Sequence, residues 1–154
     1  MDQPVIGLLS GMLLTAFIQS SSASVGILQA LASNGTLSLR QACPVLYGQN
    51  IGTCITAVLA SLGHGRNAKR AALIHVLFNT IGALIFLLLD AVLPLTEWVA
   101  SLTLDYPAAQ IANMHTLFHL VTNILFFPTG TLLMRLVEKM IPEKETSSSG
   151  PEAP

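Results

Sequence analysis

The residues best suited to chemistry in this 154-residue chain are uncharged polar side chains set inside apolar sequence. The first group is Gln19-Ser20-Ser21-Ser22, near the middle of residues 3–39, a run that has no Asp, Glu, Lys or Arg. The second group is Gly48-Gln49-Asn50-Ile51-Gly52-Thr53, where two glycines and three polar side chains interrupt another apolar run. Burying an unpaired polar group costs roughly 2–7 kcal/mol, so both groups need protein, water or a ligand as partners.

The chemistry of these side chains suits an anion and a hard cation at one place. Ser20, Ser21 and Ser22 stand where a second helical segment is expected to begin, and the first N–H groups of a helix attract anions. The nearby hydroxyl and carbonyl oxygens are hard ligands that suit sodium. We therefore expect a site that holds an oxyanion with its counter-cation, without Lys or Arg. In the structural alternative, the serines only cap a helix or hydrogen-bond between helices.

The elements that position these groups are membrane helices. Only 10% of residues are charged, against about a quarter in soluble domains. Uncharged runs cover residues 3–39, 41–65, 71–89 and 106–134, and about 20 helical residues cross the hydrocarbon core. We therefore predict an all-α integral membrane fold. The net charge of −1 argues against a nucleic-acid partner.

The first run is predicted to form a re-entrant helical hairpin with the serines at its tip. Its arms, about residues 4–18 and 20–33, are each roughly 21–23 Å long at 1.5 Å per residue, too short to cross. Such a hairpin is tolerated only where it is buried in protein or lines a wet cavity. Asn34-Gly35 is expected to end the second arm.

The later runs predict one broken and two ordinary transmembrane helices. The broken helix, residues 42–62, is expected to open at Pro44 and to unwind at 48–53, a pattern that points to a transporter binding site. Residues 71–89 and 108–134 are predicted to span, with a loop between them. Residues 1–142 would form the membrane domain and residues 143–154 a disordered cytoplasmic tail.

Basic residues predict the orientation of a multi-pass protein in the cell (inner or plasma) membrane. They cluster in the loop at 63–70 and after 134, which places that loop and the C-terminus in the cytoplasm. The hairpin then opens to the outside. Arg40 also falls outside, one charge against the rule.

Small residues recur at every fourth position and predict close helix packing. The packing interpretation applies to Gly7, Gly11, Gly26 and Ala30. Cys43 and Cys54 lie in apolar runs and are expected to be free thiols.

Residues 15–24 followed by residues 48–57 resemble the paired signature of the type II sodium/phosphate cotransporters. Arg70-Ala71-Ala72 with His75, Phe78 and Asn79 is similar to the stretch that follows in bacterial members. The likeness covers about residues 4–135 and is greatest to the second of the family's two inverted repeats. It implies half of an inverted-repeat transporter, not an enzyme.

The resemblance implies sodium-dependent phosphate symport by alternating access, with sodium as coupling ion and no other cofactor. It implies phosphate binding by Ser20, Ser21, Ser22, Asn50 and Thr53. It implies sodium binding by Gln19, Ser21, Asn50, Thr53 and Thr56. Because the motif occurs once, a homodimer, a partner half or a longer parent chain would complete the site.

Other functions stay open from the sequence. The chain could be a truncated half that only assembles or regulates. It could be a membrane redox or metal protein that uses His75, His115 and His119, although we expect these histidines to form hydrogen bonds at helix starts. A serine hydrolase is disfavoured, because the serines lack a Gly-x-Ser-x-Gly elbow and no acidic residue is available to orient a histidine.

Overall fold

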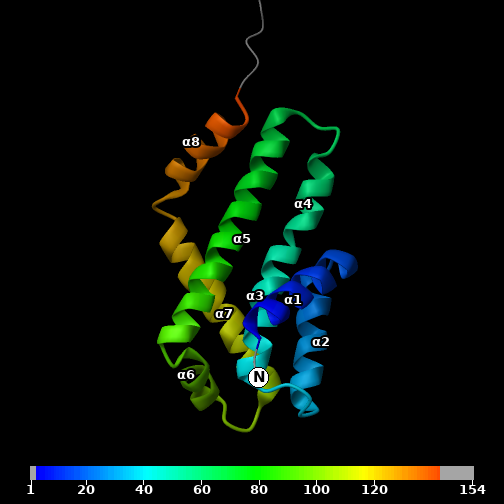
Figure 1. Ribbon diagram of the computed structural model, residues 1–154, viewed down its shortest axis with the longest axis vertical. Coiled ribbons are helices and arrows are strands. Elements are labelled where there is room, and N and C mark those ends of the chain that lie inside the picture. The colour runs from blue at the N-terminus through cyan, green and yellow to red at the C-terminus, as the bar shows by residue number, and fades with distance from the viewer. Residues whose placement is uncertain (1–2, 143–154) are drawn as a thin grey trace, which may run out of the picture.

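In the computed structural model, which describes residues 3–142, the chain folds into α-helices, and this range contains no strand. The helices are α1 (Pro4–Ile18), α2 (Ser21–Ser33), α3 (Leu39–Gly52), α4 (Cys54–Ser61), α5 (Arg66–Val92), α6 (Leu95–Leu102), α7 (Pro107–Phe126) and α8 (Gly130–Met140). Figure 1 shows an elongated bundle with α6 at one end and α8 at the other. The predicted all-α fold is confirmed, and the predicted tail, 143–154, lies outside the described residues.

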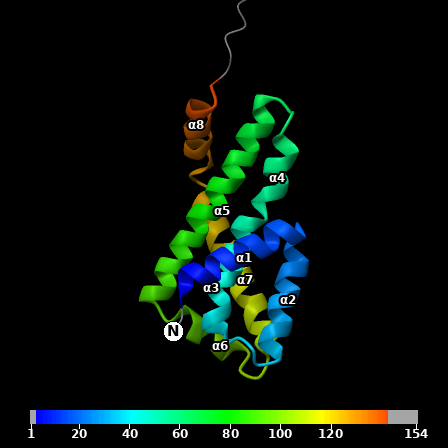
Figure 2. The same ribbon diagram turned by 45° about the vertical axis from the view of Figure 1, so that its right-hand side comes forward.

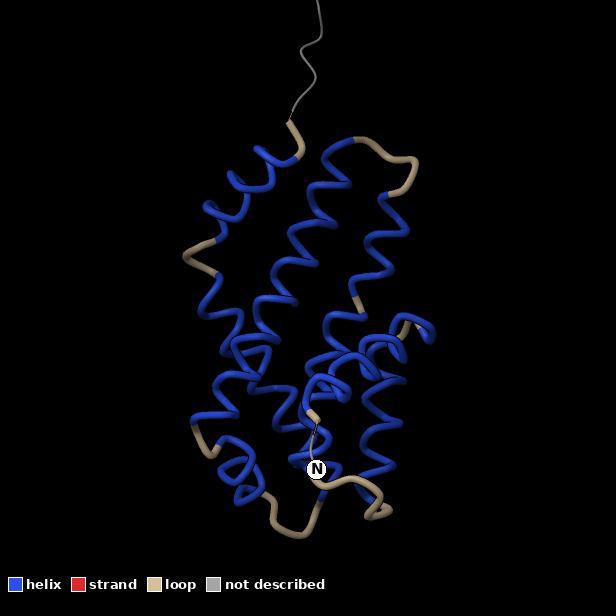
Figure 3. The backbone as a smooth tube through the Cα atoms, in the orientation of Figure 1, coloured by secondary structure: helices blue, strands red, loops and turns tan. Residues whose placement is uncertain are grey.

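Length and composition identify α5 as the one described helix able to cross a membrane alone. Helices α7 and α8 count as a second span only if they are taken together, and they bend by 78°. Residues 108–134, predicted to span as one transmembrane helix, therefore form two helices, and only the two together could be a broken span. Pro128 accounts for the break, because it has no backbone N–H to continue the helical hydrogen bonds, and Figure 3 shows the resulting loop.

The hairpin arms form as predicted. Helix α1 holds 15 residues and α2 holds 13, both shorter than a membrane crossing. Asn34 caps α2, and Gly35 follows with φ +71°, a left-handed conformation that glycine adopts without strain.

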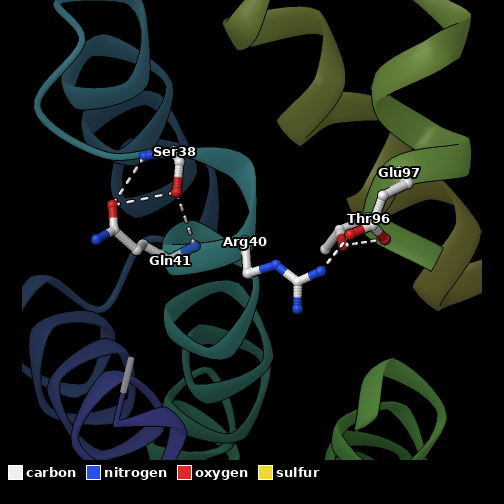
Figure 4. Close-up of polar contacts among 5 residues, drawn as sticks. All are labelled: Ser38, Arg40, Gln41, Thr96 and Glu97. Atoms are coloured by element: carbon white, nitrogen blue, oxygen red, sulfur yellow. Dashed lines mark hydrogen bonds and ion pairs between the residues drawn. The ribbon is translucent and has the colours of Figure 1, made fainter. Parts of the chain in front are cut away.

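Helix α3 begins earlier than expected, at Leu39 rather than Pro44, because Ser38 and Gln41 form a capping box. The Gln41 N–H donates to Ser38 Oγ at 3.4 Å, and the Ser38 N–H donates to Gln41 Oε1 at 3.1 Å. Figure 4 shows this box beside Arg40. Because the helix begins at Leu39, Pro44 lies inside it rather than at its start.

Helices α1 and α3 cross with their backbones in contact. A Cβ atom on Gly48 would lie 1.9 Å from Leu8 O, and one on Gly11 would lie 2.0 Å from Val45 O. One on Gly52 would lie 2.3 Å from Met12 O. The predicted packing role of the small residues in α1 is therefore confirmed, and the glycines of α3 receive α1.

The small residues of α2 do not pack inside the described chain. Ser22, Gly26 and Ala30 are exposed, and a Cβ atom on Gly26 would have no neighbour within 4 Å. Helix α2 instead buries Ser24 and Leu28 against the bundle. The packing prediction for Gly26 and Ala30 is wrong within this chain, because these residues lie on the opposite face of α2.

The core between α3, α5 and α7 is aromatic. Tyr47 lies 5.6 Å from Phe86 and 5.8 Å from Phe118, between ring centroids, and joins α3 to α5 and α7. The Tyr47 hydroxyl donates to Asp90 Oδ2 at 2.8 Å. This contact gives the polar tip of a core tyrosine a partner and fixes α3, which bears the second polar group, against α5.

Figure 2 shows α6 at the end of the bundle opposite α8 and the start of α5, and Arg40 contacts α6. It forms an ion pair with Glu97, which belongs to α6, a helix in the segment predicted to be a loop. The backbone N–H of Glu97 and the Thr96 hydroxyl hold the pKa of the Glu97 carboxyl below its usual range.

Candidate functional site

The tip of the hairpin exposes free backbone donors at the start of α2. Gln19 turns the chain with φ 55°, a left-handed conformation. Ser20 caps α2 by accepting a hydrogen bond from the Ala23 N–H at 3.3 Å. Within residues 3–142, the N–H groups of Ser21 and Ser22 have no acceptor. Two free N–H groups at the positive end of a helix dipole form an anion-binding arrangement.

The break between α3 and α4 is a single residue, Thr53, visible as a short loop in Figure 3. The Thr53 N–H still donates to Gln49 O at 3.0 Å, and its hydroxyl donates to the same oxygen at 2.9 Å. The unwinding predicted across 48–53 is therefore wrong. Gly48 and Gly52 stay helical because they receive the backbone of α1 rather than interrupt α3.

The two polar groups of the sequence meet through Ser21 and Thr53, whose hydroxyl oxygens lie 2.9 Å apart. Because the Thr53 hydroxyl already donates to Gln49 O, the Ser21 hydroxyl donates in this contact. Both oxygens then keep lone pairs for a cation, and neither hydroxyl proton is left for an anion. A second link joins the same elements, as Gln49 Nε2 donates to Ser24 O at 3.0 Å.

Three buried oxygens around these contacts have no hydrogen-bond partner in the described chain: Thr15 Oγ1, Ser24 Oγ and Gln49 Oε1. Thr15 and Ser24 are fully buried and Gln49 is 2% exposed. Thr15 faces α3, because a Cβ atom on Gly52 would lie 3.0 Å from Thr15 Cβ. A buried oxygen without a hydrogen-bond partner lowers the stability of the fold. These three uncharged oxygens could instead bind water or a hard cation.

None of these three residues was predicted as a phosphate or sodium ligand, although Gln49 belongs to the second polar group of the sequence. A signal was present, because each is an uncharged polar residue inside an apolar run. The orientation of their side chains was not readable, since Thr15, for example, stands four residues after Gly11 and so continues the series of small packing residues Gly7 and Gly11.

The structure does not bring all predicted site residues into contact. Gln19 is exposed at the tip, and Ser22 contacts Ser20 with 3.4 Å between their hydroxyl oxygens. Asn50 is buried and donates to Leu46 O at 3.0 Å, back along its own helix. The exposed Thr56 donates to Thr53 O at 3.0 Å. No hydrogen bond in residues 3–142 joins Asn50 or Thr56 to the serines.

The histidines form a pair rather than a metal centre. His115 and His119 lie one turn apart inside α7, with 2.9 Å between their Nε2 atoms. His75 lies inside α5, and His115 and His119 lie inside α7, so the expected position at helix starts is wrong for all three. In the part of the chain that the structure describes, no group of three or more His, Cys, Asp and Glu could hold a metal ion. Cys43 and Cys54 are buried free thiols, as predicted.

Comparison with known proteins assigns the chain to a family. Residues 1–104 match the sequence profile of the Na+/Pi-cotransporter family. The chain belongs to the Na+/Pi-cotransporter family. It is 45% identical over 137 residues to the uncharacterized protein YqeW of Bacillus subtilis, an alignment that covers 89% of this chain and 44% of YqeW. No solved structure shows a significant match.

Mammalian relatives belong to the sodium-dependent phosphate transport proteins. The chain is 30% identical over 148 residues to transport protein 2B of Pongo abelii, covering 92% of this chain and 21% of that protein. It is 36% identical over 97 residues to transport protein 2A of Rattus norvegicus, an alignment that covers 59% of this chain and 15% of that protein. The chain thus spans less than half the length of these curated relatives.

A test of the unpaired oxygens is the substitution Thr15→Val, which removes the hydroxyl with little change in shape. Because an unsatisfied buried hydroxyl costs about 1–3 kcal/mol, we expect valine to raise the free energy of unfolding by about 1 kcal/mol without sodium. We also expect sodium to stabilise the variant less than the wild type. Thermal unfolding in detergent, with sodium chloride or choline chloride, measures both effects.

The matched control is Thr122→Val. Thr122 is fully buried too, but its hydroxyl donates to Phe118 O at 2.7 Å. We expect this variant to gain no stability and to keep the wild-type response to sodium. Equal behaviour of the two variants would mean that Thr15 has no open site beside it.

Proposed function

We propose that the chain is one half of a sodium-dependent phosphate symporter, with its binding site between the hairpin tip and the α3–α4 break. The observation that supports this most is the contact between the Ser21 and Thr53 hydroxyls, which joins both polar groups of the sequence at one point. In the proposed site, the free N–H groups of Ser21 and Ser22 bind phosphate oxygens, and the side-chain oxygens beside them bind sodium.

The absence of basic residues from the site explains why sodium would be required. Residues 3–39 carry no charged side chain, and neither do residues 41–65. Burying an ion without compensating charge costs on the order of tens of kcal/mol by solvation estimates. Neutral N–H donors offset part of this cost, and bound sodium ions would supply the positive charge. Phosphate would therefore bind with sodium and not alone, which is the basis of coupled transport.

The proposal also includes a second subunit, because the polar motif occurs once in this chain. A second copy of the chain or a partner half would complete the site, with Gln19, Ser20, Asn50 and Thr56 as further ligands to phosphate or sodium. Alternating access in the cell membrane, with the C-terminus in the cytoplasm, would move the site between the two sides. The exposed face of α2 that carries Ser22 and Gly26 is open to such a partner.

The direct test is uptake of labelled phosphate into proteoliposomes that contain the purified chain. We expect uptake with an inward sodium gradient and none with an equal gradient of choline. Uptake that ignores sodium would contradict symport. Absence of uptake in both conditions, with intact helical content, would favour a half that only assembles or regulates.

A further inference from the structure

Helix α8 has two apolar faces, and the described chain covers only one of them. Leu133 and Val137 are buried, 8% and 1% exposed, on the side that packs against α5. Leu132, Leu136 and Met140 repeat every fourth residue along another side and are 69%, 49% and 57% exposed. Helix α8 is bent by 78° from α7 and packs beside the first turns of α5.

Basic side chains gather at this end of the molecule. Five of the described basic residues lie on α8 and the first turns of α5: Arg66, Lys69, Arg70, Arg135 and Lys139. The same segments carry one acidic residue, Glu138. The ion pair found among residues 3–142 joins Arg40 and Glu97 at the other end, so no carboxylate there pairs with this group. Figure 1 shows α8 and the start of α5 together at one end.

The start of α5 holds the end of α8 in place. Arg66 Nη1 donates to Pro142 O at 3.1 Å, and Arg70 Nε donates to Ile141 O at 3.0 Å. Arg135 and Lys139 do not take part in these links. They line an open groove with the exposed apolar residues Leu132 and Leu136.

We propose that α8 is an interfacial helix that binds the anionic phospholipids of the bilayer. Lipid phosphodiesters would contact Arg135 and Lys139, and the acyl chains would cover Leu132, Leu136 and Met140. An apolar stripe beside a basic stripe is the pattern of helices that lie in the membrane interface. A negatively charged lipid surface also complements the excess of basic residues at this end.

The test measures lipid retention by the full chain. Protein purified in an uncharged detergent is incubated with equal amounts of phosphatidylglycerol and phosphatidylcholine and purified again, and bound lipids are counted by mass spectrometry. We expect the wild type to retain phosphatidylglycerol preferentially. Arg135→Gln combined with Lys139→Gln should lower that preference about thirty-fold, since each basic residue near an anionic surface contributes about five-fold.

The matched control, Arg135→Lys combined with Lys139→Arg, keeps both charges and should keep the preference. Raising the ionic strength should weaken the preference of the wild type, a measurement that requires no variant to fold. Equal retention of both lipids by the wild type would overturn the proposal. So would an unchanged preference in the glutamine variant, or displacement of the lipid by millimolar inorganic phosphate, which would indicate a pocket for free anions. Lipid retention is independent of phosphate uptake.

Discussion

Gly48→Ala is expected to lower the free energy of unfolding by about 3 kcal/mol, at the upper end of overpacking costs. The added methyl carbon would lie 1.9 Å from Leu8 O and 2.7 Å from Leu8 C. Both atoms are backbone, so no side chain can move aside, and α1 must separate from α3. Thermal unfolding in detergent, followed by helical circular dichroism, measures the loss.

Gly26→Ala is the control for this prediction. Gly26 also lies inside a helix, but a Cβ atom there would have no neighbour within 4 Å. Because alanine favours helix over glycine by about 1 kcal/mol, the variant should be as stable as the wild type or slightly more stable. Equal unfolding temperatures for Gly26→Ala and Gly48→Ala would show that α1 and α3 do not cross at backbone contact.

Ser21→Ala is expected to raise the sodium concentration that gives half-maximal phosphate uptake by about ten-fold to a hundred-fold. The substitution removes an oxygen that faces the proposed cation site and contacts Thr53 Oγ1 at 2.9 Å. A polar contact to a charged group contributes about 1.5–3 kcal/mol, which corresponds to that range. Initial rates of uptake into proteoliposomes across a series of sodium concentrations measure the shift.

Ser10→Ala controls for the loss of a hydroxyl in the same hairpin. The Ser10 hydroxyl is exposed and donates to Gly7 O at 2.9 Å within its own helix, so the sodium dependence should not change. A conservative change, Thr53→Ser, keeps the hydroxyl beside Ser21 and should keep most of the uptake. If Ser21→Ala and Ser10→Ala have the same sodium dependence, Ser21 is not a sodium ligand.

Short-range patterns made parts of this fold predictable from the sequence. The arms of the hairpin follow from apolar composition, a polar middle and the Asn34-Gly35 stop signal, and the structure ends α1 at Ile18 and begins α2 at Ser21. The start of α3 was also readable from Ser38 and Gln41, which have the spacing of a capping box, although Arg40 between them makes the uncharged run begin only at residue 41. The bend at Pro128 was readable too, although the continuous apolar composition of residues 106–134 masked it.

Other features depend on contacts between distant segments. The glycines of α3 have the same sequence pattern whether they break a helix or receive another helix, and only the position of Leu8 and Met12 distinguishes the two cases. The contact of Ser21 with Thr53 depends on how α1 crosses α3. The sequence likewise could not indicate which face of α2 is buried, since serine and small residues lie on both faces.

The most direct measurement of the central claim is a double-mutant cycle on phosphate binding. Binding of labelled phosphate to the purified chain is measured in sodium and in choline for the wild type, Ser21→Ala, Thr53→Ala and the double variant. If the hairpin tip and the α3–α4 break form one sodium-dependent site, the wild type binds phosphate only in sodium. The double variant then loses less affinity than the two single losses combined, by about 0.5–3 kcal/mol, as expected for residues in contact. Equal binding in choline, or losses that simply add, would contradict a shared site.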